Sequence, residues 1–255
     1  MNTENKSEHD LRTERMVSEL VDGFHRLVQS AVGASIPKDT PECNDGHVLA
    51  IKVLKHVVTA RYLMTTKILV AENYPFLDNS SVAVVARTAL EGCLALHYAF
   101  CHPDLATRSF RYKMWRYSGL LERSKIVTSQ DATKEKMAGA LAQLDQLKAE
   151  LMEFDAFKRL PPKKRSDVLG GNWRPQMAWI DLAVSAGISR LLFQQFYGYL
   201  CGHCHSSFIS VLQTRDSMQS VALQQKTRLD AGSSACDRDG SRDRLLLRDR
   251  CSRRG

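Results

Sequence analysis

Apolar residues recur with helical spacing along most of the chain, while no alternating strand pattern of useful length appears. Prolines and capping residues divide the apolar stretches into segments. The pattern therefore predicts an all-α fold, a multi-helix bundle. Its helices are expected at about residues 16–31, 47–73, 79–101, 105–126, 131–154, 176–185 and 189–213.

Two segments lie outside this helical pattern. Residues 161–172, PPKKRSDVLGGN, are basic and glycine-rich and are predicted to form a loop. After about Gln225 the composition changes to a mixture of Arg and Asp without aromatic residues. Such a segment cannot bury enough apolar surface to become ordered. We expect one helical domain over residues 1–225 and a disordered tail over residues 226–255.

Arg87 and Glu91 stand one helical turn apart in the apolar run from Ser80 to Cys101. A helix that is apolar on all sides belongs in a core, so the pair is predicted to be buried. Burial of two charges is costly even when they pair well. Two interpretations remain: an ion pair that fixes the register of the bundle, or a polar site in which Glu91 holds Arg87 for an anion.

A second polar set occupies the last predicted helix. Tyr197, Cys201 and His205 are spaced four residues apart and share one face. They form either a core face with locally satisfied polar tips or part of a site in which His205 transfers protons. His203 and Cys204 add potential metal ligands, but a regular helix spreads these groups around its circumference. No metal site and no cofactor are therefore predicted.

Basic residues collect on one side of the predicted helix at 105–126. Arg108, Arg111 and Arg116 alternate with Tyr112 and Trp115. The arginines suit a phosphate backbone and the aromatic rings suit stacked bases, although a solvated helix face has the same pattern. Asn172 and Trp173 follow two glycines, and the tryptophan either covers a cavity or anchors the core.

Composition narrows the class of protein. Of the 255 residues, 44% are hydrophobic and 25% are charged, as in globular proteins. Half of the net charge of +8 comes from the segment after Gln225, which holds nine basic residues and five aspartates, so basicity argues only weakly for nucleic acid. The seven cysteines, an odd number, and the polar N-terminus favour a cytoplasmic protein. Charges interrupt both long apolar runs, so no membrane association is expected.

Motifs of several common enzyme classes are missing from the sequence. It contains no phosphate-binding loop, dinucleotide-binding glycine pattern, nucleophile elbow or H-E-x-x-H motif. This weighs against common nucleotide-binding enzymes, serine hydrolases and zinc proteases.

Three stretches resemble the bacterial family called domain of unknown function five-six-seven-seven, over roughly residues 48–212. ARTALEGCLALHYAF is similar to its Arg-x-x-x-Glu helix, which places the family residues on Arg87 and Glu91. KKRSDVLGGNWRPQMAWIDLAVSAG is similar to its basic loop followed by Trp, here Trp173. FYGYLCGHCHSS is similar to its Tyr-x-x-x-Ser-x-x-x-His helix, with Tyr197, His205, and Cys201 in place of Ser.

The resemblance implies an all-α bundle with HEPN-like up-and-down packing, and it supplies no activity. HEPN ribonucleases place His four to six residues after Arg on one helix, and no His in this sequence has an Arg at that distance. We expect instead a composite site, with Arg87 and Glu91 on one helix and His205 and Tyr197 on another, that binds or cleaves RNA or a nucleotide. The alternative is a non-enzymatic interaction protein, such as a defence or toxin–antitoxin component or a homodimer.

Overall fold

The computed structural model describes residues 7–34, 40–65, 68–69, 75–76, 78–126, 131–216 and 218–219. Its named helices are α1 (Glu8–Gln29), α2 (Pro41–Thr65), α3 (Asn79–Phe100), α4 (Leu105–Ser124), α5 (Asp131–Glu153), α6 (Asp155–Lys158), α7 (Pro162–Leu169), α8 (Trp179–Ser185) and α9 (Arg190–Cys204). Residues 208–216 are also helical. Two antiparallel two-residue strands, β1 (Ile68–Leu69) and β2 (Pro75–Phe76), join α2 to α3. The predicted all-α fold is confirmed.

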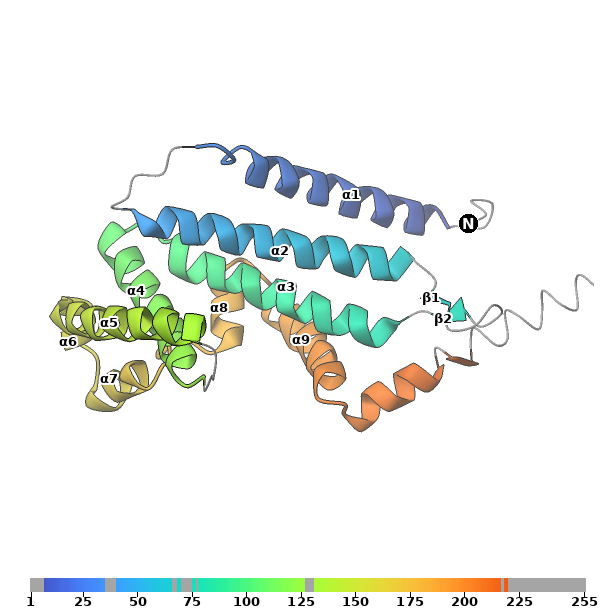
Figure 1. Ribbon diagram of the computed structural model, residues 1–255. Helices are drawn as coiled ribbons and strands as arrows, with labels where there is room; N and C mark the ends of the chain where they lie inside the picture. Colours follow the sequence, from blue (N-terminus) through green and yellow to red (C-terminus); the bar gives the residue numbers. More distant parts are fainter. Residues whose placement is uncertain are drawn as a thin grey trace, which may run out of the picture.

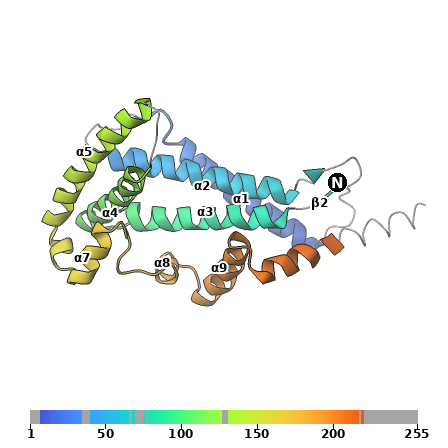
Figure 2. The ribbon, with the colours of Figure 1, turned by 60° about the horizontal axis from the view of Figure 1, so that its bottom comes forward.

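The long helices α1, α2 and α3 lie side by side, and α4 to α7 gather at one end of this layer (Figure 1). The turned view places α8 and α9 along the side of α3 that faces away from α2 (Figure 2). Helix α3 therefore lies in the middle of the molecule and contacts α2, α4, α8 and α9. Among the described helices, only α3 has the length and the apolar composition that a membrane-spanning helix needs. The core helix of a globular protein can meet the same two criteria.

Helix α3 begins where the sequence predicts it. The side chain of Asp78 accepts a hydrogen bond from the Ser81 amide, which satisfies one of the free N–H groups of the first turn. Further along, Gly92 allows α2 to come close, because a Cβ atom at this position would lie 2.7 Å from Cγ2 of Val53. The contact between α2 and α3 thus depends on a residue without a side chain.

The main core lies where α3 and α4 meet α5, α7, α8 and α9. Its largest fully buried members include Leu94, Leu151, Leu182 and Val168. Helix α1 contributes less, because it packs against α2 on one side only. Val21 and Val28 form its buried face, whereas Leu20 of the predicted apolar stripe is 71% exposed.

The structure corrects three predicted boundaries. Residues 162–169 form α7 rather than a loop: Pro162 takes the first helical position, where its ring fits, and Val168 is buried in the core. Helix α2 also begins at a proline, Pro41, because the ring fits the first position of a helix. The predicted start of this helix was near residue 47. The single helix predicted at 189–213 ends at Cys204, and the predicted tail at 226–255 lies outside the described residues.

Candidate functional site

Arg87 and Glu91 lie on the side of α3 that α9 crosses. The Nε of Arg87 donates a hydrogen bond to Oε1 of Glu91 at 2.9 Å, as the spacing predicts. Their side chains are 20% and 29% exposed, so the expectation of a buried pair is wrong. The pair can therefore be reached from solvent.

Tyr197 of α9 binds the same carboxylate. Its hydroxyl donates to Oε1 of Glu91 at 2.6 Å, so one oxygen accepts from both Arg87 and Tyr197. The ring of Tyr197 stacks on Phe193 at 4.8 Å between centroids, and the Arg87 guanidinium lies 5.4 Å from its centroid. Glu91 consequently fixes the positions of two donors from two helices.

His205 completes this group. Its Nε2 lies 3.4 Å from Nη1 of Arg87. A guanidinium can only donate, so a hydrogen bond between these two atoms uses Nε2 as the acceptor. The structure thus brings together Arg87, Glu91, Tyr197 and His205, the four residues of the predicted composite site.

His205 occupies the C-cap of α9 rather than a continuous helix. The chain reverses at Ser206, whose φ of 49° is left-handed, and the Ser207 amide donates to the Gly202 carbonyl at 3.0 Å. A Cβ atom at Gly202 would lie 3.0 Å from the Ser207 hydroxyl, so this close return depends on glycine. The turn leaves His205 exposed and directed at α3.

The buried ring of His203 braces the same turn. Its Nδ1 lies 3.2 Å from the Ser80 hydroxyl, and its Nε2 lies 2.8 Å from Oε1 of Gln213. These contacts tie the end of α9 to the start of α3 and to the helical residues 208–216. His203 is therefore a structural residue in this arrangement.

The electrostatics keep Arg87 charged and Tyr197 protonated. Contact with the Cys204 side chain and hydrogen bonds to Glu91 and Tyr197 raise the pKa of Arg87, although burial opposes the shift. Burial, followed by the hydrogen bond to Glu91, raises the pKa of Tyr197 well above its usual range. Cys201, which stands at the family's Ser position, is half-buried on the same helix.

The raised pKa of Tyr197 predicts a loss of stability at alkaline pH. Above pH 10.0, the ordinary pKa of the side chain, the unfolded chain releases the phenolic proton while the folded chain retains it. Unfolding is then favoured as pH rises. Urea unfolding between pH 9 and 11 should show a shallower decline for Tyr197→Phe than for the unchanged chain. Equal slopes would show that Tyr197 titrates alike in both states.

Arg174 is a site neighbour that the sequence analysis missed. Its guanidinium lies 4.2 Å from the ring centroid of Trp179, and that ring is 6.5 Å from the ring of Tyr197. Burial lowers the pKa of Arg174, whereas the charge of Glu91 opposes the shift. A cation between two tryptophans, as in NWRPQMAW, is the sequence signal that could have suggested it.

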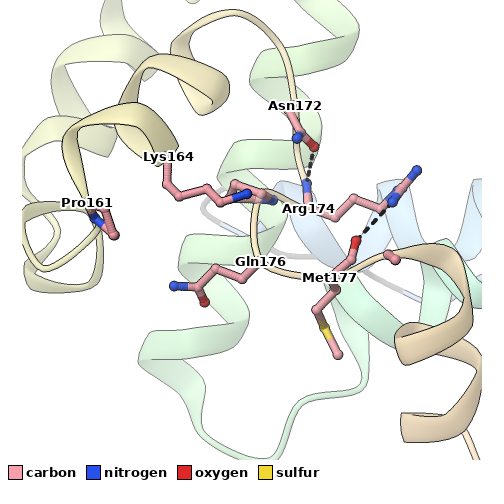
Figure 3. Close-up of a pocket in the computed structure, with 8 residues that line it drawn as sticks. Pro161, Lys164, Asn172, Arg174, Gln176 and Met177 are labelled. Carbon is pink, nitrogen blue, oxygen red and sulfur yellow. Dashed lines mark hydrogen bonds between the residues drawn. The ribbon is translucent and has the colours of Figure 1, made fainter.

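Trp173 and Asn172 have different surroundings. Trp173 packs edge-on against Tyr98 at 5.4 Å and belongs to the rim of the core, as the core-anchor interpretation expects. Asn172 is exposed, and its Oδ1 accepts from the Arg174 amide at 3.1 Å (Figure 3). Both residues position the segment that carries Arg174.

The predicted basic face of α4 is largely engaged within the protein. The Arg111 guanidinium lies 4.5 Å from the Tyr98 ring, and Arg116 contacts Gln143 of α5 at 3.3 Å. Tyr112 is buried, and its hydroxyl donates to Asp45 at 2.7 Å, so it cannot stack on a base as predicted. Arg108 is half-buried at the start of α4. These residues do not join the site on α3 and α9.

In the described part of the chain, no three His, Cys, Asp or Glu side chains converge as a metal site would require. The chemistry of the described site is that of a fixed guanidinium beside an imidazole nitrogen.

Comparison with known proteins gives one family. The model of a family of unknown function (DUF5677) matches residues 54–219, which include all four residues of the site. Searches of curated proteins and of solved structures give no significant match.

Proposed function

The chain belongs to the DUF5677 family, whose function is unknown, and we propose from the site itself that Arg87, Glu91, Tyr197 and His205 bind and cleave RNA at a phosphate group. The observation that carries the proposal is the contact of Arg87 with both Glu91 and Nε2 of His205. An anion-binding donor and a proton acceptor thus occupy adjoining positions.

Arg87 supplies the phosphate-binding group. Its Nε is committed to Glu91, which orients the planar fork of its remaining N–H donors. Such a fork matches the oxygens of a phosphate. Two guanidiniums, Arg87 and Arg174, lie near one carboxylate, so the site favours an anion over a cation.

His205 supplies the proton acceptor. In the proposed reaction Nε2 takes the proton of a ribose 2′-hydroxyl, whose oxygen attacks the adjacent phosphorus. The bond from phosphorus to the 5′-oxygen breaks, and that oxygen takes a proton from a water molecule, which regains one from protonated His205. The products are a 2′,3′-cyclic phosphate and a free 5′-hydroxyl, so the reaction consumes no water and no oxidant. Arg87 neutralises the charge on the phosphoryl oxygens.

Replacing Arg87 with Met should weaken binding of single-stranded RNA about tenfold to a hundredfold, since a hydrogen bond to a charged group contributes about 1.5–3 kcal/mol. Fluorescence anisotropy of labelled RNA at low salt with EDTA present measures the change. Arg190→Met is the matched control, because Arg190 of α9 is exposed and pairs with Asp181 at 3.1 Å. Equal affinity of both variants would rule out Arg87 as the phosphate-binding group.

A second candidate function is binding to a partner protein or to a second copy of the chain. Exposed apolar side chains support it. Those on α9 and residues 208–216 are Leu191, Leu192, Phe196, Tyr199, Phe208, Ile209 and Val211. Sedimentation over a hundredfold range of protein concentration tests self-association. A concentration-independent monomer would contradict the homodimer.

A further inference from the structure

A cavity of about 480 Å³ opens beside the segment that carries Arg174. It lies between the start of α7 and residues 172–178, and its lining includes Pro161, Lys164, Asn172, Arg174, Gln176 and Met177 (Figure 3). Its volume is within the range of pockets that hold small ligands.

The lining offers donors and no carboxylate. Lys164 brings positive charge, and the Asn172 and Gln176 amides bring neutral hydrogen-bonding groups. Because Oδ1 of Asn172 already accepts from the Arg174 amide, the side chain presents its NH₂ donors to a ligand. Lys164 has a neighbour in Asp167 at 3.7 Å, but both side chains are at least one-third exposed, so this ion pair is weak.

Proline and methionine supply the apolar part of the lining. Pro161 and Met177 present hydrocarbon surfaces of the kind that pack against the face of a base. A combination of cationic, amide and apolar groups suits a nucleotide, which has a phosphate, hydrogen-bonding base edges and a flat apolar face.

Arg174 connects this cavity to the phosphate site. Its main chain borders the cavity, whereas its guanidinium is directed away from Lys164 (Figure 3) and lies over Trp179. Trp179 neighbours Tyr197, whose hydroxyl is bound to Glu91. The cavity and the phosphate site therefore lie on two sides of one short segment.

We propose that this cavity is a nucleotide subsite, which holds the residue next to the phosphate bound at Arg87 when the ligand is single-stranded RNA. The inference rests on the proposed function and adds a substrate class to it. Lys164 binds the neighbouring phosphate, the Gln176 and Asn172 amides contact the base edge, and Arg174 spans the two positions. The protein should therefore prefer a short oligonucleotide to a single nucleotide.

The test compares uridine 5′-monophosphate with the trinucleotide UpUpU by isothermal titration at low salt. The full chain should bind UpUpU at least tenfold more tightly. The double change Lys164→Ala and Gln176→Ala should remove most of this preference. It should also reduce the slope of log K against log salt concentration for UpUpU binding by about 1, which corresponds to the loss of one phosphate contact. Lys163→Ala is the matched control, because Lys163 is an exposed neighbour outside the cavity lining.

The outcomes separate the two proposals. If the double variant retains the full preference for UpUpU while Arg87→Met weakens both ligands, the subsite is wrong and the phosphate site stands. If Arg87→Met changes neither affinity but the double variant lowers UpUpU binding, the cavity binds RNA and the site at Arg87 is wrong. If the unchanged chain binds neither probe, both proposals are overturned.

Discussion

Replacement of His205 with Ala is expected to slow metal-free RNA cleavage by about 10²- to 10⁴-fold, the usual effect of losing a general base. Nε2 of His205 lies 3.4 Å from Nη1 of Arg87, and alanine offers no atom that could accept the ribose proton there. Arg87 keeps its contact with Glu91, so RNA affinity should change far less than the rate. Gel analysis of labelled RNA with EDTA present measures the rate.

His102→Ala is the control for this experiment. His102 contacts only the main chain of Asp104 in its own turn, among the hydrogen bonds seen in the described structure. Its replacement should leave the rate unchanged. If the His205→Ala protein cleaves RNA as fast as the unchanged chain, His205 takes no part in the mechanism. If the cleavage products contain no 2′,3′-cyclic phosphate, attack by the 2′-hydroxyl is excluded.

Leu151→Ala should lower the free energy of unfolding by about 2–5 kcal/mol, the range for removing a buried leucine side chain. Leu151 is fully buried on α5, within the core cluster that also contains residues of α3 and α4. The loss combines the transfer of the removed atoms with the cavity that they leave. Urea denaturation followed by circular dichroism at 222 nm gives the change.

Leu141→Ala provides the comparison on the same helix. Leu141 is 47% exposed, so its removal should cost well under 1 kcal/mol. Both leucines belong to α5, and the two variants test which of them the core holds. Similar losses for both would mean that α5 packs along a different face.

Local signals predicted the helices that begin at good caps. Asp78 and Asp104 cap α3 and α4 at the expected places, because their side chains bind amides only three residues ahead. The end of α9 was not predictable in this way. It depends on a close return of the chain at Gly202, which a helical pattern of apolar residues does not record.

The site was predicted only in part, because local spacing determines some of its contacts and tertiary packing determines the others. The bond from Arg87 to Glu91 follows from helical spacing alone. The approach of His205 depends on how α9 crosses α3, a tertiary property, and it entered the prediction through the family resemblance. Arg174 was missed because its neighbours, Trp179 and Tyr197, are brought to it by packing rather than by periodicity.

The distance along the chain between Arg87 and His205, 118 residues, has a consequence for biosynthesis. A ribosome has already released α3 long before it reaches the turn after α9, and the brace from His203 needs Gln213 as well. Nascent or truncated chains that end earlier would carry the guanidinium without its imidazole partner. The proposed catalytic pair therefore forms only in a chain translated past its last described helix, so incomplete products of this protein are expected to lack the proposed activity.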